Sequence, residues 1–284
     1  MKDLLGFIRI MRPVNSIMVG FAIIVGVIIG GGKTMLESQM ILAYTFLTGF
    51  LLSGSSMTIN DYYDRDIDAI NEPNRVIPSG VITPTEALVW SILLAITGLL
   101  AAYLTSWKHL VLAVIAWGAS IFYATKGKKM GLPGNIIVSV CVALPFVYGG
   151  LIAGDIAFFS SLIFSLIAFF TNIGREITKG IVDIEGDKAE GINTIAVKYS
   201  SKRAAVSSII LYLIAVFLSF LPVITEMVTF WYVPFIIITD VGLIYVSYSL
   251  LRNNNRENSR KIKNIVRILM IIGLIGFLAG SLIV

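Results

Sequence analysis

Apolar residues are concentrated in nine long runs of this chain, and polar residues fill the segments between them. The runs cover residues 14–31, 39–59, 84–106, 109–125, 134–153, 156–178, 203–222, 229–251 and 264–284. Each is close to the ~20 residues that an α-helix needs to cross the hydrocarbon core of a bilayer. The pattern predicts an all-α integral membrane protein with nine transmembrane helices in a bundle. The composition agrees, because a hydrophobic content of 57% is higher than that of an ordinary soluble domain.

The charged residues predict how these spans are oriented. Nine spans place 20 of the 22 lysines and arginines on one side, which holds the N-terminus and the loops after spans two, four, six and eight. By the positive-inside rule this side is cytoplasmic, so we expect a multi-pass protein of the cell membrane with a cytoplasmic N-terminus. The net charge of +5 is then explained by membrane topology and by attraction to anionic lipid headgroups. The sequence has no basic tract with interleaved aromatic residues, so nucleic-acid binding is not indicated.

Nothing in the chain separates one domain from another. The first run follows Arg12-Pro13 and lacks a typical cleavage site, so we expect it to stay in the mature protein. No Pro/Ser-rich linker interrupts the sequence, which predicts a single transmembrane domain over residues 1–284. Acidic clusters follow the second and the sixth span, and this spacing suggests two four-helix halves plus one helix, with both clusters at a shared cytoplasmic mouth.

The first acidic cluster has four aspartates within eight residues. Acids beside hydrocarbon cost free energy unless they are paired, solvated or bound to metal, so the cluster indicates a functional site. On a helix, Asn60, Asp61, Asp64 and Asp68 share an arc of roughly 100°. They would present carboxylate and amide oxygens to Mg²⁺, whereas Asp66 points elsewhere.

The second cluster repeats the spacing of four residues with Asp183 and Asp187, and Glu185 points elsewhere. Basic residues nearby favour a phosphorylated ligand over calcium, although the positive-inside rule by itself demands lysines here. Arg175 and Lys179 are the strongest candidates for binding such a ligand, because they lie two turns and one turn before Asp183 on the same side of the predicted helix. The other candidates are Arg12, Arg75, Lys126, Lys128 and Lys129.

These motifs resemble those of the UbiA superfamily of membrane prenyltransferases. Asn60-Asp61-x-x-Asp64-x-x-x-Asp68 is similar to its first motif, Asp183-x-x-x-Asp187 to its second, and Arg12-Pro13-x-Asn15 to its entry to the first span. Within the superfamily, the runs NDYYDRDIDAINEPNRVIPSG (60–80) and GREITKGIVDIEGD (174–187) resemble most the digeranylgeranylglyceryl phosphate synthases.

The resemblance implies a Mg²⁺-dependent transferase. It would move a geranylgeranyl group from geranylgeranyl diphosphate to a hydroxyl of geranylgeranylglyceryl phosphate, forming the second ether bond of archaeal-type lipids. The implied catalytic residues are Asp64, Asp68, Asp183 and Asp187, and the implied metal ligands are these four with Asn60 and Asp61. Substrate contacts are expected from Arg12, Asn15, Tyr123, Lys126, Lys128, Arg175 and Lys179.

Two other functions stay open at this stage. Aromatic acceptors of quinone biosynthesis would use the same diphosphate half of the site. A cation transporter would also need acids, but at mid-membrane, where Asp240 is the single example. Asp240 could contact the acceptor substrate or form a hydrogen bond to a neighbouring helix. His109 is expected in an exposed loop.

Overall fold

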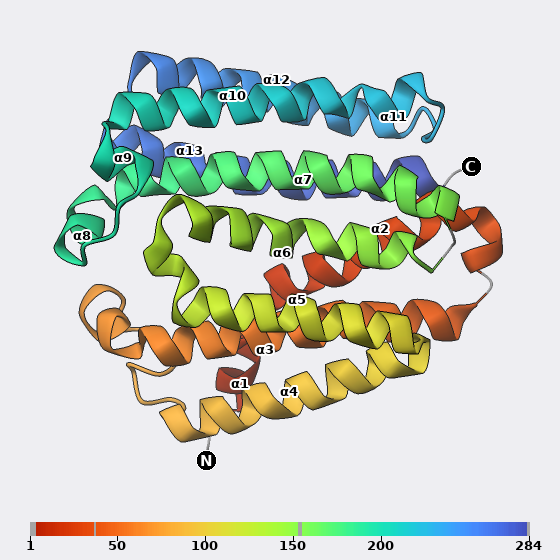
Figure 1. The fold of residues 1–284 in the computed structure, drawn as a ribbon, viewed down its shortest axis with the longest axis horizontal. Helices are drawn as coiled ribbons and strands as arrows, with labels where there is room; N and C mark the ends of the chain where they lie inside the picture. Colours follow the sequence, from red (N-terminus) through yellow and green to blue (C-terminus); the bar gives the residue numbers. More distant parts are fainter. Residues whose placement is uncertain (1–3, 37, 153–154, 283–284) are drawn as a thin grey trace. The chain divides into compact units, whose positions relative to one another are not determined.

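The computed structural model of the protein describes residues 4–36, 38–152 and 155–282 (Figure 1). All regular elements in this part of the chain are helical. They are α1 (Leu4–Ile10), α2 (Pro13–Leu36), α3 (Gln39–Asn71), α4 (Pro84–Thr105), α5 (Trp107–Thr125), η1 (Gly127–Met130), α6 (Leu132–Gly150), α7 (Asp155–Val182), α8 (Ile184–Ala189), α9 (Ile195–Lys198), α10 (Ser201–Ser219), α11 (Leu221–Ile224), α12 (Tyr232–Arg252) and α13 (Arg256–Leu282).

The predicted membrane spans all coincide with long helices. Eight helical segments in the described residues are long and apolar enough to cross a bilayer. A ninth span arises where α1 and the first part of α2 are joined through a bend of 54°. The all-α membrane fold is thus confirmed, while the predicted span ends at 153 and 284 lie outside the described residues.

Contacts divide the chain into two compact units of unequal size. The first contains residues up to Ile24 and Ser38–Lys126, and the second contains Val25–Glu37 and the chain from Gly127 onward. The boundary falls inside α2, so three spans lie entirely in the first unit and five in the second. The expected division into four-helix halves therefore differs from the observed one.

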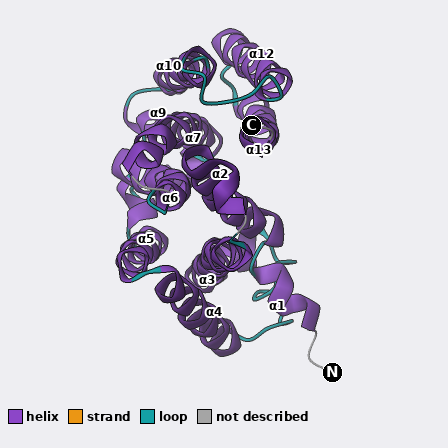
Figure 2. Cartoon of the chain, turned by 90° about the vertical axis from the view of Figure 1, so that its right-hand side faces the viewer, coloured by secondary structure: helices purple, strands orange, loops and turns teal. Residues whose placement is uncertain are grey.

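The first unit is organised around α3, which packs along α4, while α5 contacts both helices (Figure 2). A buried serine joins the three. Ser55 on α3 lies 2.9 Å from the Ser91 hydroxyl on α4, and Trp117 Nε1 on α5 donates to Ser55 Oγ at 3.0 Å. Interhelical hydrogen bonds of this kind hold helices together where the surrounding lipid offers no alternative partner.

A small apolar core fixes the segments that flank the first acidic motif. Ile10 at the end of α1 packs with Ile77 and Ile82 of the loop after α3 and with Ala87 of α4. Trp90 Nε1 on α4 also donates to the Phe7 carbonyl of α1 at 3.1 Å. The loop after α3 is therefore held against α1, and this brings two arginines to the same place.

In the second unit, α7 is the central helix. It packs against α6, α10 and α13, and α12 completes the unit by contacting α10 and α13 (Figure 2). Gly174 permits the close approach of α7 and α10, because a Cβ atom there would lie 2.7 Å from the ring of the buried Tyr212. The second acidic motif follows directly at the end of α7.

His109 differs from its expected position. It is buried in the first turn of α5 instead of exposed in a loop, and its Nδ1 lies 2.7 Å from the hydroxyl of Ser106. Ser106 is the N-cap of α5, so the helix begins two residues earlier than the predicted span and encloses the imidazole.

Candidate active site

The first acidic motif is helical, as its spacing predicts. Helix α3 is 33 residues long, or roughly 50 Å, and it continues without a break for three turns beyond the end of the predicted span. Asn60 Nδ2 donates to Asp64 Oδ2 at 2.9 Å across one of these turns. The polar extension of a membrane helix thus presents an amide group and a carboxylate side by side.

Asp61 and Asp68 lie on the same extension but are only 7% and 6% exposed. Arg75 Nη1 donates to Asp68 Oδ2 at 2.6 Å and lies 3.7 Å from Asp61 Oδ1. Arg12 Nη2 donates to Asp61 Oδ1 at 2.5 Å. Two guanidinium groups therefore compensate two buried carboxylates, as buried charges require.

Arg12 has an unusual backbone conformation. Its φ is +49°, in the left-handed region that few residues other than glycine adopt. It lies at the bend between α1 and α2, where Ser16 Oγ donates to the Met11 carbonyl at 2.8 Å and the Asn15 amide donates to the Arg12 carbonyl at 2.9 Å. The turn is thus braced on both sides of Arg12, and Asn15 takes part through its backbone.

Asp66 does not belong to the cluster. Its side chain is 85% exposed, and its nearest charged partner is Arg65 at 3.7 Å. The expectation that Asp66 points away from the other acids is confirmed.

The second acidic motif is not one continuous helix. Helix α7 ends at Val182, and Asp183 occupies the N-cap position of the short helix α8, which contains Asp187. The Asp187 amide nevertheless donates to the Asp183 carbonyl at 2.8 Å, so the two residues keep a one-turn relationship. Burial, and then the charge of Asp183, raise the pKa of Asp187 from 3.8 to about 6, against a hydrogen bond from Thr194.

The raised pKa means that burial and the neighbouring acids disfavour the ionised form of Asp187 more than Thr194 and Lys179 favour it. Glu185, between the two aspartates, is 87% exposed and faces only Arg256 at 3.6 Å. As predicted, Glu185 is directed away from the pair.

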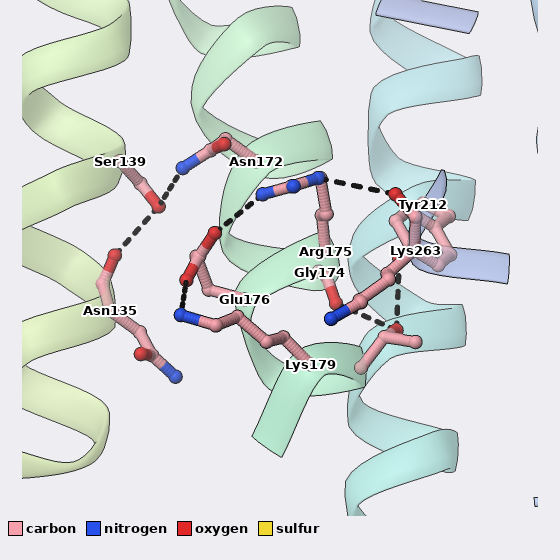
Figure 3. A network of polar contacts seen from close by, with 10 residues as sticks. Asn135, Ser139, Asn172, Gly174, Arg175, Glu176, Lys179, Tyr212 and Lys263 are labelled. Carbon is pink, nitrogen blue, oxygen red and sulfur yellow. Dashed lines mark hydrogen bonds and ion pairs between the residues drawn. The ribbon is translucent and has the colours of Figure 1, made fainter. Parts of the chain in front are cut away.

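Arg175 and Lys179 are joined by a residue that the sequence analysis did not single out (Figure 3). Glu176 on α7 is buried, and its Oε1 accepts from Arg175 Nη1 at 2.7 Å, while Oε2 lies 3.8 Å from Lys179 Nζ. Arg175 Nε also donates to the Lys263 carbonyl of α13 at 3.3 Å. An acid within an otherwise apolar span is the sequence feature that could have identified Glu176.

Further hydrogen bonds fix the helices around this ion pair (Figure 3). Asn172 Nδ2 on α7 donates to Ser139 Oγ on α6 at 3.1 Å. The Thr178 hydroxyl lies 2.9 Å from the hydroxyl of the buried Tyr212 on α10. Hydrogen bonds to α6, α10 and α13 therefore fix the position of α7, and with it the positions of Arg175 and Lys179.

The basic residues that follow α5 lie on either side of the boundary between the two units. Lys126 is exposed at the C-cap of α5 in the first unit, and Lys128 is half-buried in η1 of the second unit. Tyr123 is half-buried within α5. Their expected contacts with substrate stay a prediction.

Asp240 is buried in α12 and hydrogen-bonded to a neighbouring helix. Ser219 Oγ at the end of α10 lies 2.7 Å from Asp240 Oδ2, and Tyr232 Oη donates to the Ser219 carbonyl at 2.9 Å. Of the two roles left open for Asp240, the structure thus shows the interhelical hydrogen bond.

The acidic residues supply suitable donors for Mg²⁺ without forming a complete cage. Across the residues with described side chains, no three acidic, histidine or cysteine side chains converge as a metal site would require. Mg²⁺ is usually held by one or two carboxylates, with water and substrate phosphate completing its octahedron. The Asp64 carboxylate, with the Asn60 amide one turn before it on the same helix, fits that mode of binding.

Residues 18–274 match the UbiA prenyltransferase family. The chain belongs to this family. The match covers both acidic motifs and at least part of every long helix, and it favours prenyl transfer over ion transport.

Individual UbiA proteins are similar over almost the whole chain. Digeranylgeranylglyceryl phosphate synthase from Methanosphaera stadtmanae is 35% identical, covering 97% of this chain and 99% of its own. A solved structure of a digeranylgeranylglyceryl phosphate synthase is 32% identical, with a TM-score of 0.78 and complete coverage of both chains. The structure of a UbiA homologue from Archaeoglobus fulgidus, bound to GPP and Mg²⁺, has a TM-score of 0.62 and covers 96% of this chain and 99% of its own. Its sequence is 20% identical, so this similarity supports the fold alone.

Proposed function

We propose that this UbiA protein transfers a geranylgeranyl group from geranylgeranyl diphosphate to a hydroxyl of geranylgeranylglyceryl phosphate. The observation that carries the proposal is the similarity, over nearly the whole chain, to digeranylgeranylglyceryl phosphate synthases. The half-buried arginines and lysine beside the acidic motifs support it, because both substrates are phosphorylated. Residues 1–284 act as one domain in this proposal.

The reaction exchanges one C–O bond for another. The allylic C–O bond of the donor breaks, and both of its electrons leave with the diphosphate. The acceptor hydroxyl oxygen then forms the ether bond to the same carbon, and its proton is released to water or to the diphosphate. The step needs stabilisation of the departing negative charge and exclusion of water from the allylic cation.

The acidic motifs are the proposed diphosphate site. The residues that would hold Mg²⁺ are Asn60, Asp61, Asp64, Asp68, Asp183 and Asp187. Solved structures of a UbiA homologue from Archaeoglobus fulgidus contain Mg²⁺ together with GPP or DMAPP. When bound, the metal neutralises the leaving diphosphate and so lowers the barrier to its departure. Asp64, with its neighbour Asn60, is the strongest candidate ligand.

The basic residues have a separate role in binding phosphate. Arg12, with Asn15 in the same turn, is held beside the first motif, and Arg175 and Lys179 precede the second. Guanidinium groups bind phosphate oxygens in a bidentate manner, whereas lysine acts as a point charge. Lys126, Lys128 and Tyr123 would contact the phosphate or the allylic cation of one of the substrates.

The experiment is a transfer assay with purified protein in detergent. Wild type and the Asp64→Ala, Asp183→Ala double variant are incubated with Mg²⁺, geranylgeranyl diphosphate and geranylgeranylglyceryl phosphate, and the diether product is sought by mass spectrometry. Product from wild type alone, and its loss on chelation by EDTA, is the expected result. Transfer to an aromatic acceptor instead would overturn the proposed acceptor, and no transfer by folded protein would overturn the reaction.

The proposed location is the cell membrane, with the N-terminus and both acidic motifs on the cytoplasmic side. Single cysteines can test it in a Cys141→Ser background. Asp66→Cys and Trp107→Cys place exposed thiols at opposite ends of the first unit's helices. An impermeant maleimide applied to intact cells should label Trp107→Cys at once and Asp66→Cys only after permeabilisation; the reverse pattern would invert the topology.

A further inference from the structure

We infer that a groove on the second unit binds an anionic phospholipid of the surrounding bilayer. The groove has a volume of about 670 Å³ and lies where the beginning of α10 meets α9 and the beginning of α6. It is lined by Leu132, Ile195, Tyr199, Ser200, Lys202, Arg203, Val206 and Ser207. None of these residues belongs to the acidic motifs or to the proposed substrate contacts.

The groove has one charged and hydroxylated end. Lys202 and Arg203 are exposed in the first turn of α10, and the eight lining residues include no acid. The Tyr199 ring is approached by Lys198 Nζ at 5.3 Å and by the Arg203 guanidinium at 5.5 Å. These contacts hold two cations at one aromatic side chain, with Lys202 beside them in the sequence, a combination that suits a phosphate headgroup at the membrane interface.

The hydroxyl groups at this end belong to a rigid turn. Ser200 Oγ accepts from the Arg203 amide at 3.2 Å, and Ser207 Oγ donates to the Arg203 carbonyl at 3.0 Å. The Ser200 hydroxyl hydrogen is thus directed away from the helix and can be donated to a phosphate oxygen. The backbone that carries Lys202 and Arg203 is ordered by the same two bonds.

The other end of the groove continues into an apolar strip. Val206 lines the groove, and Ile210, Leu213 and Phe217 follow it on the same face of α10 at intervals of three or four residues. All four side chains are exposed. Because Ser201–Ile224 is one of the candidate spans, this strip faces hydrocarbon and would take the lipid chain, while the basic end takes the headgroup.

A lipid is the occupant that fits both ends at once. Free phosphate would use only the basic end. The positive choline group of a zwitterionic lipid would be repelled by Lys202 and Arg203, and the groove lining includes no acid to pair with it. The site is independent of the proposed reaction, so the failure of one leaves the other unaffected. Its consequence is that anionic lipid stabilises the fold of the second unit in the membrane.

Native mass spectrometry of the full chain in detergent tests the inference. Wild type, Lys202→Gln/Arg203→Gln and the matched control Arg252→Gln/Arg256→Gln are titrated with dioleoylphosphatidylglycerol, dioleoylphosphatidylcholine or inorganic phosphate. The control removes the same charge from exposed positions outside the groove. We expect phosphatidylglycerol to bind wild type and control equally and the groove variant at least ~10-fold more weakly, because each basic residue contributes to attraction by anionic lipid.

Thermal unfolding with each lipid gives a second measurement. Phosphatidylglycerol should raise the Tm of wild type and control but not of the groove variant. Equal binding by all three proteins, equal binding of phosphatidylcholine, or displacement of the lipid by inorganic phosphate would overturn the assignment of an anionic lipid.

Discussion

Arg12 and Asp61, 49 positions apart in the chain, are joined by a 2.5 Å bond from Nη2 to Oδ1. Arg12 adopts a left-handed backbone conformation to make this contact, and the core around Ile10 holds the turn in place. Unusual backbone conformations persist where surrounding structure imposes them, often at functional sites. The pair therefore connects the entry to the first span with the first acidic motif.

Replacing Arg12 should impair activity. Arg12→Gln leaves the buried Asp61 carboxylate with only the more distant Arg75, and a hydrogen bond to a charged group is worth about 1.5–3 kcal/mol. We expect kcat/KM in the transfer assay to fall ~10- to 100-fold. Arg9→Gln is the matched control, because Arg9 is exposed on α1; a similar loss in both variants would argue against a specific role of the Arg12–Asp61 pair.

The first acidic motif contains its own control. Asp64→Asn removes the carboxylate beside Asn60 and should lower kcat by about 100-fold or more, since stabilisation of the leaving charge is lost. Asp66→Asn changes a side chain that is exposed to solvent and should leave the rate within about twofold of wild type. Equal rates for the two variants would show that Asp64 is not a metal or diphosphate ligand.

The second motif permits the same comparison. Asp187→Asn is expected to abolish most product formation while leaving the Tm of the purified protein nearly unchanged, because the amide has the same shape and keeps an oxygen acceptor for Thr194. Glu185→Gln, at an exposed neighbouring position, should be active. A large fall in the Tm of Asp187→Asn with full activity per folded molecule would instead indicate a structural role.

Glu176 is expected to position the two cations on α7. Glu176→Gln removes the charge that holds Arg175 at 2.7 Å and Lys179 at 3.8 Å, so both cations become less ordered. The KM of a phosphorylated substrate should rise roughly 5- to 10-fold, an effect of about 1 kcal/mol, with a smaller change in kcat. Glu257→Gln, which breaks an exposed pair with Lys261, should change neither constant; a loss confined to kcat would contradict a positioning role.

Asp240 should prove structural. Asp240→Asn keeps an acceptor for the Ser219 hydroxyl and is expected to retain activity within about twofold. Asp240→Leu and Ser219→Ala remove the bond between α10 and α12 and should each lower unfolding free energy by about 0.5–1.5 kcal/mol in detergent. Strong inactivation of the folded Asp240→Asn variant would place this carboxyl in the chemistry.

Hydropathy and charge predicted most of the fold. Transmembrane helices satisfy their backbone hydrogen bonds within each segment, so their positions follow from local sequence. The helical spacing of Asn60 and Asp64, and the outward direction of Asp66, follow from the same periodicity because α3 continues unbroken. The second motif was less predictable, since the end of α7 at Val182 depends on the turn into α8.

Some positions differ from those expected from the sequence. Glu176 was not recognised as the partner of Arg175 and Lys179, although the i, i+3 spacing of Glu176 and Lys179 on one helix indicates that pair. His109 was expected in solvent, yet the N-cap at Ser106 encloses it in α5. The predicted halves also differ from the observed units, whose boundary lies inside α2.

Local sequence thus determined the membrane class, the positions of the spans and the candidate residues for binding metal and phosphate, because each depends on composition or on periodicity within one helix. Tertiary structure decided which charges meet. Arg12 and Arg75 reach Asp61 and Asp68 only because Ile10, Ile77 and Ile82 pack into one core. That packing depends on side chains from segments far apart in the chain, and no pattern within any one segment specifies it.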